Sequence, residues 1–418
     1  MVVRNKARLP GVLSKEGIDY EETFAPVARL EAIRILLAFA ASKGFKLQQM
    51  DVKSAFPNGF IEEEVYVRQP PGFESARFPD RVYKLRKALY GLKQAFRAWY
   101  ARLKSFLLKC GFVMGSVDKT LFLLSRGGDT TIVQIYVDDI IFGGSSHALV
   151  SSKAPKEPLS IKQSTQGTYS RIQTRRLMPM KMGRRWTEGI LRDDRLTSYL
   201  TATRPDIQFA VRLCARYRAS PRTSHRQVVF EIHSELGLWY SSGSSLFLRG
   251  FSDADHAGCR IDRKSTSGTC QLLGTSLVSW SSRKQASVSL SRVHSCYSQL
   301  LWMKATLSDF GLRFGKIPLL VDSTSAISVA KNPVLHSRTK HIDVRFHFLR
   351  GHYEKGDIDL VHVASENQLA DIFTKPLEFG AFVRLRGELG VLQVEGVDNA
   401  LIKGEIESQW TGLIALLV

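Results

Sequence analysis

Residues 132–142 form an apolar run, Ile-Val-Gln-Ile-Tyr-Val-Asp-Asp-Ile-Ile-Phe, which two adjacent aspartates interrupt. The β-branched and aromatic residues on both sides predict two short strands, so Asp138 and Asp139 should lie at or beside a hairpin turn. Aspartate tolerates turn dihedrals, and a hairpin without chemical function is the simpler interpretation of this pattern alone. A third carboxylate, Asp51, ends another predicted strand, and three such groups together could hold two divalent ions for phosphoryl transfer.

Longer motifs around these aspartates resemble the reverse transcriptase of copia-type long-terminal-repeat retrotransposons. They are QMDVKSAF at 49–56, LYGLKQA at 89–95 and YVDD at 136–139. A second set resembles the ribonuclease H domain that follows in the same polyprotein. It comprises FSDAD at 251–255, DRKSTSG at 262–268 and HSRTKHID at 336–343. The resemblance implies an α/β chain with a palm-and-fingers polymerase-like domain followed by a ribonuclease H-like mixed-sheet domain.

The motifs also suggest how the chain is divided. We expect reverse transcriptase fingers and palm at 1–150, a degraded connecting region at 151–245, a ribonuclease H-like domain at 246–390 and a tail at 391–418. Residues 151–200 carry eleven lysines and arginines against four acidic residues, without helical or strand periodicity. This stretch is either damaged coding sequence or a basic arm that binds nucleic acid.

The resemblance assigns carboxylates to two metal sites, each with Mg²⁺ or Mn²⁺ as cofactor. The polymerase site would be formed by Asp51, Asp138 and Asp139. The ribonuclease H-like site would be formed by Asp253, Asp322 and Asp371. Taken singly, each of the last three could equally be an ordinary strand-end or helix-cap residue.

The same resemblance implies contacts with nucleotide or template, made by Lys6, Arg8, Arg29, Gln94 and Tyr136. Lys6 and Arg8 lie in a segment similar to a fingers strand, although a solvated basic terminus explains them as well. Gln94 would lie on a helix beginning near Leu89, where an exposed glutamine is the alternative. Arg34, on a helix predicted over 31–43, is a further candidate contact.

The chain departs from the family pattern at residues 287–295. The family has a helix start there with the remaining catalytic glutamate, whereas this chain has no acidic residue between Asp262 and Asp309. Asp255 is too far along its strand to replace that ligand. We therefore predict that the ribonuclease H-like domain has lost activity and that the chain is degenerate in this region.

Charge and composition point to a polyanionic partner. Lysine and arginine number 59 against 39 aspartates and glutamates, a net charge of +20, which favours nucleic acid over a merely basic protein. The implied partners are an RNA template, a DNA primer, an RNA–DNA hybrid and deoxynucleoside triphosphates. The five cysteines lack metal-ligand spacing. No apolar run reaches the roughly eighteen residues of a membrane span, so we expect no membrane and a cytoplasmic or nuclear location.

The sequence thus supports two functions. The first is an RNA-directed DNA polymerase that uses two metal ions, joined to an inactive ribonuclease H-like domain. The second is a catalytically dead, nucleic-acid-binding remnant of the same polyprotein. Primer extension on an RNA template distinguishes them.

Overall fold

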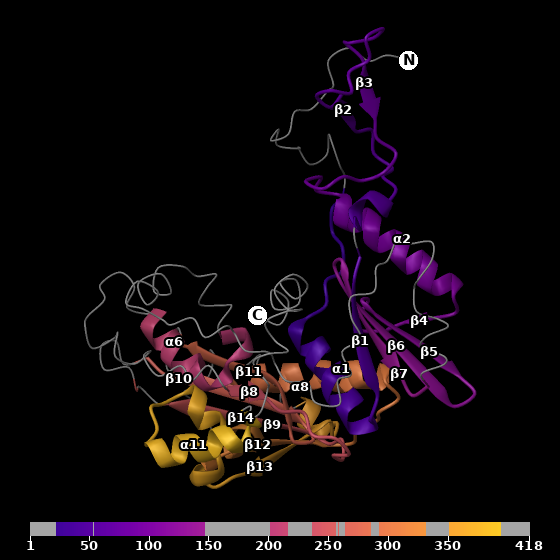
Figure 1. Cartoon of the computed structure of the whole chain (residues 1–418). Helices are drawn as coiled ribbons and strands as arrows, with labels where there is room; N and C mark the ends of the chain where they lie inside the picture. The colour runs from indigo at the N-terminus through magenta and orange to yellow at the C-terminus, as the bar shows by residue number, and fades with distance from the viewer. Residues whose placement is uncertain are drawn as a thin grey trace. The chain divides into compact units, whose positions relative to one another are not determined.

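The fold is that of a computed structural model, which forms two compact units (Figure 1). Residues 22–28 and 47–146 belong to the first unit, and the other described residues, including 29–46, belong to the second. The structure describes residues 22–52, 54–146, 201–215, 236–255, 258, 264–285, 292–331 and 351–393. The predicted boundary at residue 150 and the basic stretch 151–200 lie outside these ranges.

A five-stranded sheet with the order β1-β7-β6-β5-β4 forms the centre of the first unit. Its strands are β1 (Lys46–Asp51), β4 (Val113–Met114), β5 (Leu121–Arg126), β6 (Asp129–Tyr136) and β7 (Asp139–Gly144). Strands β6 and β7 are antiparallel, and the pairing of Tyr136 with Asp139 leaves only two residues for the turn. The hairpin predicted from the interrupted apolar run is therefore confirmed.

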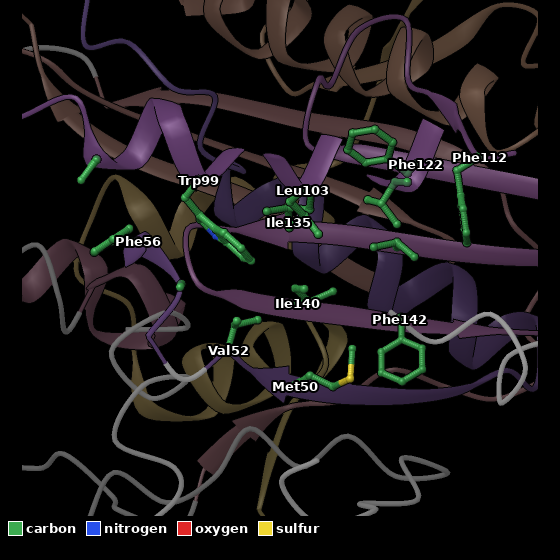
Figure 2. Close-up of a cluster of buried hydrophobic side chains, with 14 of the residues drawn as sticks. Met50, Val52, Phe56, Trp99, Leu103, Phe112, Phe122, Ile135, Ile140 and Phe142 are labelled. Carbon is green, nitrogen blue, oxygen red and sulfur yellow. The ribbon is translucent and has the colours of Figure 1, made fainter. Parts of the chain in front are cut away.

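Helix α2 (Ala95–Lys109) packs on this sheet through side chains four residues apart. Ala95, Trp99, Leu103 and Leu107 are all buried, and Figure 2 shows the apolar cluster that they share with the strands. The helix was predicted to begin near Leu89, and that prediction is wrong. Turns precede it, with Gly91 at φ 93°, a conformation that does not continue into an α-helix.

Short elements complete the first unit. A 3-10 helix, η1 (Phe56–Asn58), follows β1 and has Pro57 in its first turn, where a helix needs no backbone donor; a helix that began further upstream would need one there. Beyond it, β2 (Tyr66–Arg68) and β3 (Val82–Lys84) form a separate antiparallel pair.

The second unit contains a mixed sheet with the order β11-β10-β9-β12-β13. Strands β9, β10 and β11 are antiparallel, whereas β12 runs parallel to both β9 and β13. The bounds are β9 (Leu248–Asp255), β10 (Thr266–Leu273), β11 (Ser276–Lys284), β12 (Ile317–Val321) and β13 (Ile358–His362). This is the ribonuclease H-like mixed sheet that the resemblance implied.

Helix α8 (Arg292–Asp309) packs closely on β9. A Cβ atom on Gly250 would lie 2.8 Å from Leu300 and 3.1 Å from the Cys296 sulfur, so glycine lets the helix approach the strand. Further helices with described bounds in this unit are η2 (Pro205–Ile207), α6 (Gln208–Ala215), α9 (Thr324–Lys331), η4 (Ser365–Asn367), η5 (Leu369–Phe373) and α11 (Phe379–Glu388).

The strands β8 (Leu236–Leu238) and β14 (Val391–Gln393) pair with each other in an antiparallel ribbon. Residues 391–393 of the predicted tail are therefore ordered into a strand. Within the part of the chain that the structure describes, every helix is too short or too polar to traverse a bilayer.

Helix α1 (Leu30–Lys43) belongs to the second unit, although it precedes β1 in the chain. Residues 32–40 are all buried, which is typical of a helix enclosed on every side. Arg34 is only 5% exposed, and its guanidinium donates to the carbonyls of Val278, at 3.1 Å, and of Ala202. It also lies over the Trp280 ring at 4.0 Å. Arg34 was a candidate contact for template or nucleotide, and that prediction is wrong, because these partners enclose its charged group.

Candidate active sites

The three carboxylates predicted for the polymerase site come from neighbouring strands of the first unit. Asp51 is the last residue of β1, Asp138 lies in the turn, and Asp139 begins β7. Strands β1 and β7 are adjacent in the sheet, and the Val52 N–H donates to the Asp138 carbonyl at 3.2 Å. The fold therefore brings the three aspartates to one end of the same strand pair.

Burial and mutual repulsion disfavour ionisation of two of these carboxylates. Burial chiefly, together with the charges of Asp138 and Asp51, raises the pKa of Asp139 to about 6, against a hydrogen bond from Gln49 that lowers it. That bond joins Gln49 Nε2 to Asp139 Oδ1 at 3.0 Å. Burial and the charge of Asp51 likewise raise the pKa of Asp138. A divalent cation would relieve this repulsion, so the charge of the three residues suits a metal site, although their oxygens do not all lie within 4.8 Å of one another.

The turn that carries Asp138 has an unusual backbone. Val137 has a φ of 55°, and only Ser54 shares a positive φ among non-glycine residues of the described ranges. The Trp99 indole nitrogen donates to the Val137 carbonyl at 2.8 Å. The helix α2 is thereby linked directly to the turn between the two strands.

The predicted nucleotide contacts have different environments. Tyr136 is half-buried, and burial followed by the charge of Asp139 raises its pKa. Gln94 is only 4% exposed, and no described residue hydrogen-bonds its buried Oε1, so the exposed-glutamine alternative is wrong. Arg29 is exposed in the second unit, with its guanidinium 5.0 Å from the Trp302 ring. Lys6 and Arg8 lie outside the described residues.

Two carboxylates of the ribonuclease H-like site come from adjacent parallel strands. Ser252 of β9 pairs with Val321 of β12, so Asp253 and Asp322 each follow a paired residue at the same end of the strands. Side chains at the carboxyl ends of neighbouring parallel strands meet at one edge of a sheet. The register alone therefore places these two aspartates side by side.

The short helix η5 adds the third carboxylate. Gly268 pairs with Asp253, and a Cβ atom on Gly268 would lie 2.5 Å from the Ala370 carbonyl oxygen, so η5 can cross the strand here. Carboxylate oxygens of Asp253, Asp322 and Asp371 all lie within 4.8 Å of one another. Oδ1 of Asp371 is buried and accepts no hydrogen bond from the described residues. This carboxylate cluster with an unused oxygen fits a divalent cation.

Two residues that follow Asp371 also contact the cluster. The Thr374 hydroxyl donates to Asp253, and the Lys375 ammonium lies 2.9 Å from Oδ2 of Asp371. Burial raises the pKa of Asp371 to about 7, an effect that Lys375 opposes and Asp253 reinforces. Burial and the charge of Asp253 also raise the pKa of Asp322. Lys375 thus supplies one fixed positive charge beside three carboxylates.

No fourth carboxylate joins this cluster from α8. The helix begins at Arg292 and has no acidic residue in its first turn. The sequence itself has no acidic residue between Asp262 and Asp309. The departure from the family pattern at 287–295 therefore leaves the first turn of α8 without a carboxylate ligand.

Sequence reasoning missed three polar residues that shape these sites: Gln49, Thr374 and Lys375. Gln49 is two residues before Asp51 in a strand, so the two side chains share a face of the sheet, and this spacing could have identified it. Lys375 follows Asp371 by four residues, a spacing that allows ion pairing over one turn. Nothing in the sequence pattern singled out Thr374.

Comparison with known proteins identifies a family profile and several similar proteins. A family profile described as "Reverse transcriptase (RNA-dependent DNA polymerase)" matches residues 1–162. The chain is 34% identical to the Retrovirus-related Pol polyprotein from transposon RE1 of Arabidopsis thaliana, over 94% of this chain and 31% of that protein. It is 30% identical to a putative transposon Ty5-1 protein of Saccharomyces cerevisiae, over 56% of this chain and 92% of that protein.

Among solved structures, a foamy viral protease-reverse transcriptase in complex with an RNA/DNA hybrid aligns with a TM-score of 0.45 at 12% identity. That alignment covers 85% of this chain and 48% of the viral one. The chain spans about a third of the length of the plant polyprotein. The quoted motifs, the profile match and the relatives agree, and the chain belongs to the reverse transcriptase family found in the Pol polyproteins of copia-type retrotransposons.

Proposed function

We propose that the first unit is an RNA-directed DNA polymerase whose site is formed by Asp51, Asp138 and Asp139. The observation that carries this proposal is the convergence of these carboxylates at the β6–β7 turn beside the end of β1. They would hold Mg²⁺ or Mn²⁺, which when bound supplies Lewis-acid stabilisation of nucleotidyl transfer. RNA template, DNA primer and deoxynucleoside triphosphates are the proposed substrates.

The surrounding residues prepare these carboxylates for their role. Gln49 engages Oδ1 of Asp139 and so fixes the orientation of that carboxylate. Asp51 is exposed, which leaves its oxygens accessible to substrate and cation from solvent. The net charge of +20 favours association with the phosphate backbone of primer and template.

Replacement of Asp138 by asparagine tests the site. The change keeps the shape of the side chain but removes a charge that would hold the cation, so extension of a DNA primer on RNA should fall by at least about a hundredfold. The matched control is Asp80→Asn, which removes one charge at an exposed position between β2 and β3. Unchanged extension by Asp138→Asn would show that the site is wrongly assigned.

A wild-type chain that binds primer–template but extends it in neither Mg²⁺ nor Mn²⁺ would favour the remnant function. Binding needs only the basic surface, whereas extension needs all three carboxylates in place. The two readouts should therefore be measured on the same preparation of the full chain.

We propose further that the ribonuclease H-like site cleaves the RNA of a hybrid weakly or not at all. Two-metal hydrolysis requires enough ligands for two ions about 4 Å apart. Asp253, Asp322 and Asp371 could hold one cation, and Lys375 already neutralises part of their charge. Without a carboxylate from α8, a second ion would be poorly held.

The test uses the full chain and a labelled RNA–DNA hybrid, in Mg²⁺ and in Mn²⁺. We expect no cleavage above that of Asp322→Asn, which removes one of the three remaining ligands. Cleavage by the wild-type chain that Asp322→Asn abolishes would show that three aspartates suffice.

A further inference from the structure

We propose that Trp99 is a positioning residue for the polymerase carboxylates, because its indole N–H holds the Val137–Asp138 turn in a strained conformation. This inference rests on the proposed function of Asp138 and Asp139. Trp99 itself lies in the core and is 1% exposed. Its indole N–H donates to a backbone carbonyl, that of Val137, and not to an acidic side chain. Its role would be exerted through the backbone of the turn.

The turn is strained at Val137. The residue has a φ of 55° in a two-residue hairpin turn, a conformation that glycine adopts readily and that a β-branched side chain opposes. Asp138, the second residue of the turn, does not share the positive φ. That pattern of φ signs is found in type II′ turns, in which glycine is typical of the first position. Such strain persists only where surrounding groups enforce it.

Trp99 supplies one of those groups. It projects from α2 toward the strands that carry Ile135 and Ile140 (Figure 2). Its Nε1 donates to the Val137 carbonyl at 2.8 Å, a good geometry for a buried N–H. The Val137 side chain packs at the margin of the same apolar cluster. A relaxed turn would break the bond and leave the indole N–H and the Val137 carbonyl without this partner.

A second bond holds the other residue of the turn. The Val52 N–H donates to the Asp138 carbonyl at 3.2 Å, so each of the two turn carbonyls has a donor from a different element. The bond from Val52 adjoins Asp51, and the bond from Trp99 comes from α2. Together they fix the turn between β1 and the helix, and with it the directions of Asp138 and Asp139.

Trp99→Phe tests this role, because it deletes the N–H while keeping an aromatic ring in the core. We expect kcat for primer extension to fall by about ten- to a hundredfold, the scale of a small misplacement of reacting groups, with KM for primer–template unchanged. Leu103→Val, one turn along α2 in the same cluster, controls for loss of packing. An equal fall in kcat for Leu103→Val at a similar loss of thermal stability would overturn the inference.

Relief of the strain should reduce the need for Trp99. In a Val137→Gly background the turn adopts a positive φ without steric cost, so Trp99→Phe should lower kcat by less than about threefold. Additive effects of the two changes would refute the proposed coupling, since they would show that Trp99 acts independently of the turn.

A readout independent of activity separates this inference from the proposed function. Binding of Mn²⁺ to the full chain can be followed by electron paramagnetic resonance, and the polymerase site identified as the one that Asp138→Asn abolishes. Trp99→Phe should weaken that site at least about fivefold, whereas Leu103→Val should not. If the wild-type chain binds Mn²⁺ at this site but does not extend primers, the proposed polymerase activity is refuted. The positioning role of Trp99 can still be tested in that case, through the Mn²⁺ affinity of Trp99→Phe. Unchanged Mn²⁺ affinity in Trp99→Phe, or no Mn²⁺ bound at Asp138, would refute the positioning role.

Discussion

Asp139→Asn should stabilise the metal-free protein at neutral pH while it abolishes primer extension. Asp139 is 7% exposed, and burial chiefly, with the charges of Asp138 and Asp51, raises its pKa from 3.8 to about 6. Each pKa unit corresponds to about 1.4 kcal/mol, so keeping Asp139 ionised costs the folded chain roughly 3 kcal/mol at pH 8. The substitution removes this cost, and the amide oxygen that it introduces can still accept the hydrogen bond from Gln49.

The pH dependence has a definite sign. Between pH 3.8 and about 6 the folded state holds a proton at Asp139 that the unfolded state has released, so stability falls as the pH rises through this window. The destabilisation is complete above about pH 6 and vanishes near pH 4. The free energy of unfolding of Asp139→Asn should therefore exceed that of the wild type by about 2–3 kcal/mol at pH 8 and equal it near pH 4.

The assay is urea unfolding in the presence of EDTA, followed by tryptophan fluorescence at both pH values. Asp80→Asn is the control, because it removes the same charge from an exposed loop, where the effect should stay within about 0.5 kcal/mol. The electrostatic reasoning would be refuted if Asp139→Asn were no more stable to urea than the wild type at pH 8, or if its gain in stability were the same at both pH values.

Two further predictions concern the second unit and the basic surface. Gly268→Ala should lower the free energy of unfolding in urea by about 1–3 kcal/mol, because the added Cβ would lie 2.5 Å from the Ala370 carbonyl oxygen. The control is Gly315→Ala, whose added Cβ would meet no atom within 4 Å, and equal effects of the two changes would contradict the close approach of η5. The affinity for primer–template should fall as the salt concentration rises, with a slope of log affinity against log salt of about −0.9 for each phosphate neutralised on duplex. An affinity that does not change with salt in a fluorescence anisotropy titration would exclude the basic residues as the interface.

Local patterns predicted the parts of the fold that depend on neighbours in sequence. The hairpin at Asp138 and Asp139 followed from β-branched residues on either side of two adjacent aspartates. The buried face of α2 followed from the helical spacing of Leu103 and Leu107. In each case the signal lies within about ten residues, where strand or helix geometry fixes which side chains share a face.

Contacts between distant segments could not be predicted in this way. The burial of Arg34 depends on the carbonyls of Val278 and Ala202, far along the chain. The helix expected from Leu89 begins later because Gly91 adopts a positive φ, which its neighbours did not signal. The bond from Trp99 to Val137 also escaped notice, since the apolar spacing of α2 is satisfied by Trp99 as a core residue alone.

The assignment of α1 to the second unit bears on how such a chain can be divided. The helix lies between two segments of the first unit, at 22–28 and from residue 47 onward. One cut near residue 150 would leave α1 on the wrong fragment, with the buried surface of residues 32–40 deprived of β11. Neither unit can therefore be expressed whole as one uninterrupted segment, because residues 29–46 of the second unit lie between two segments of the first.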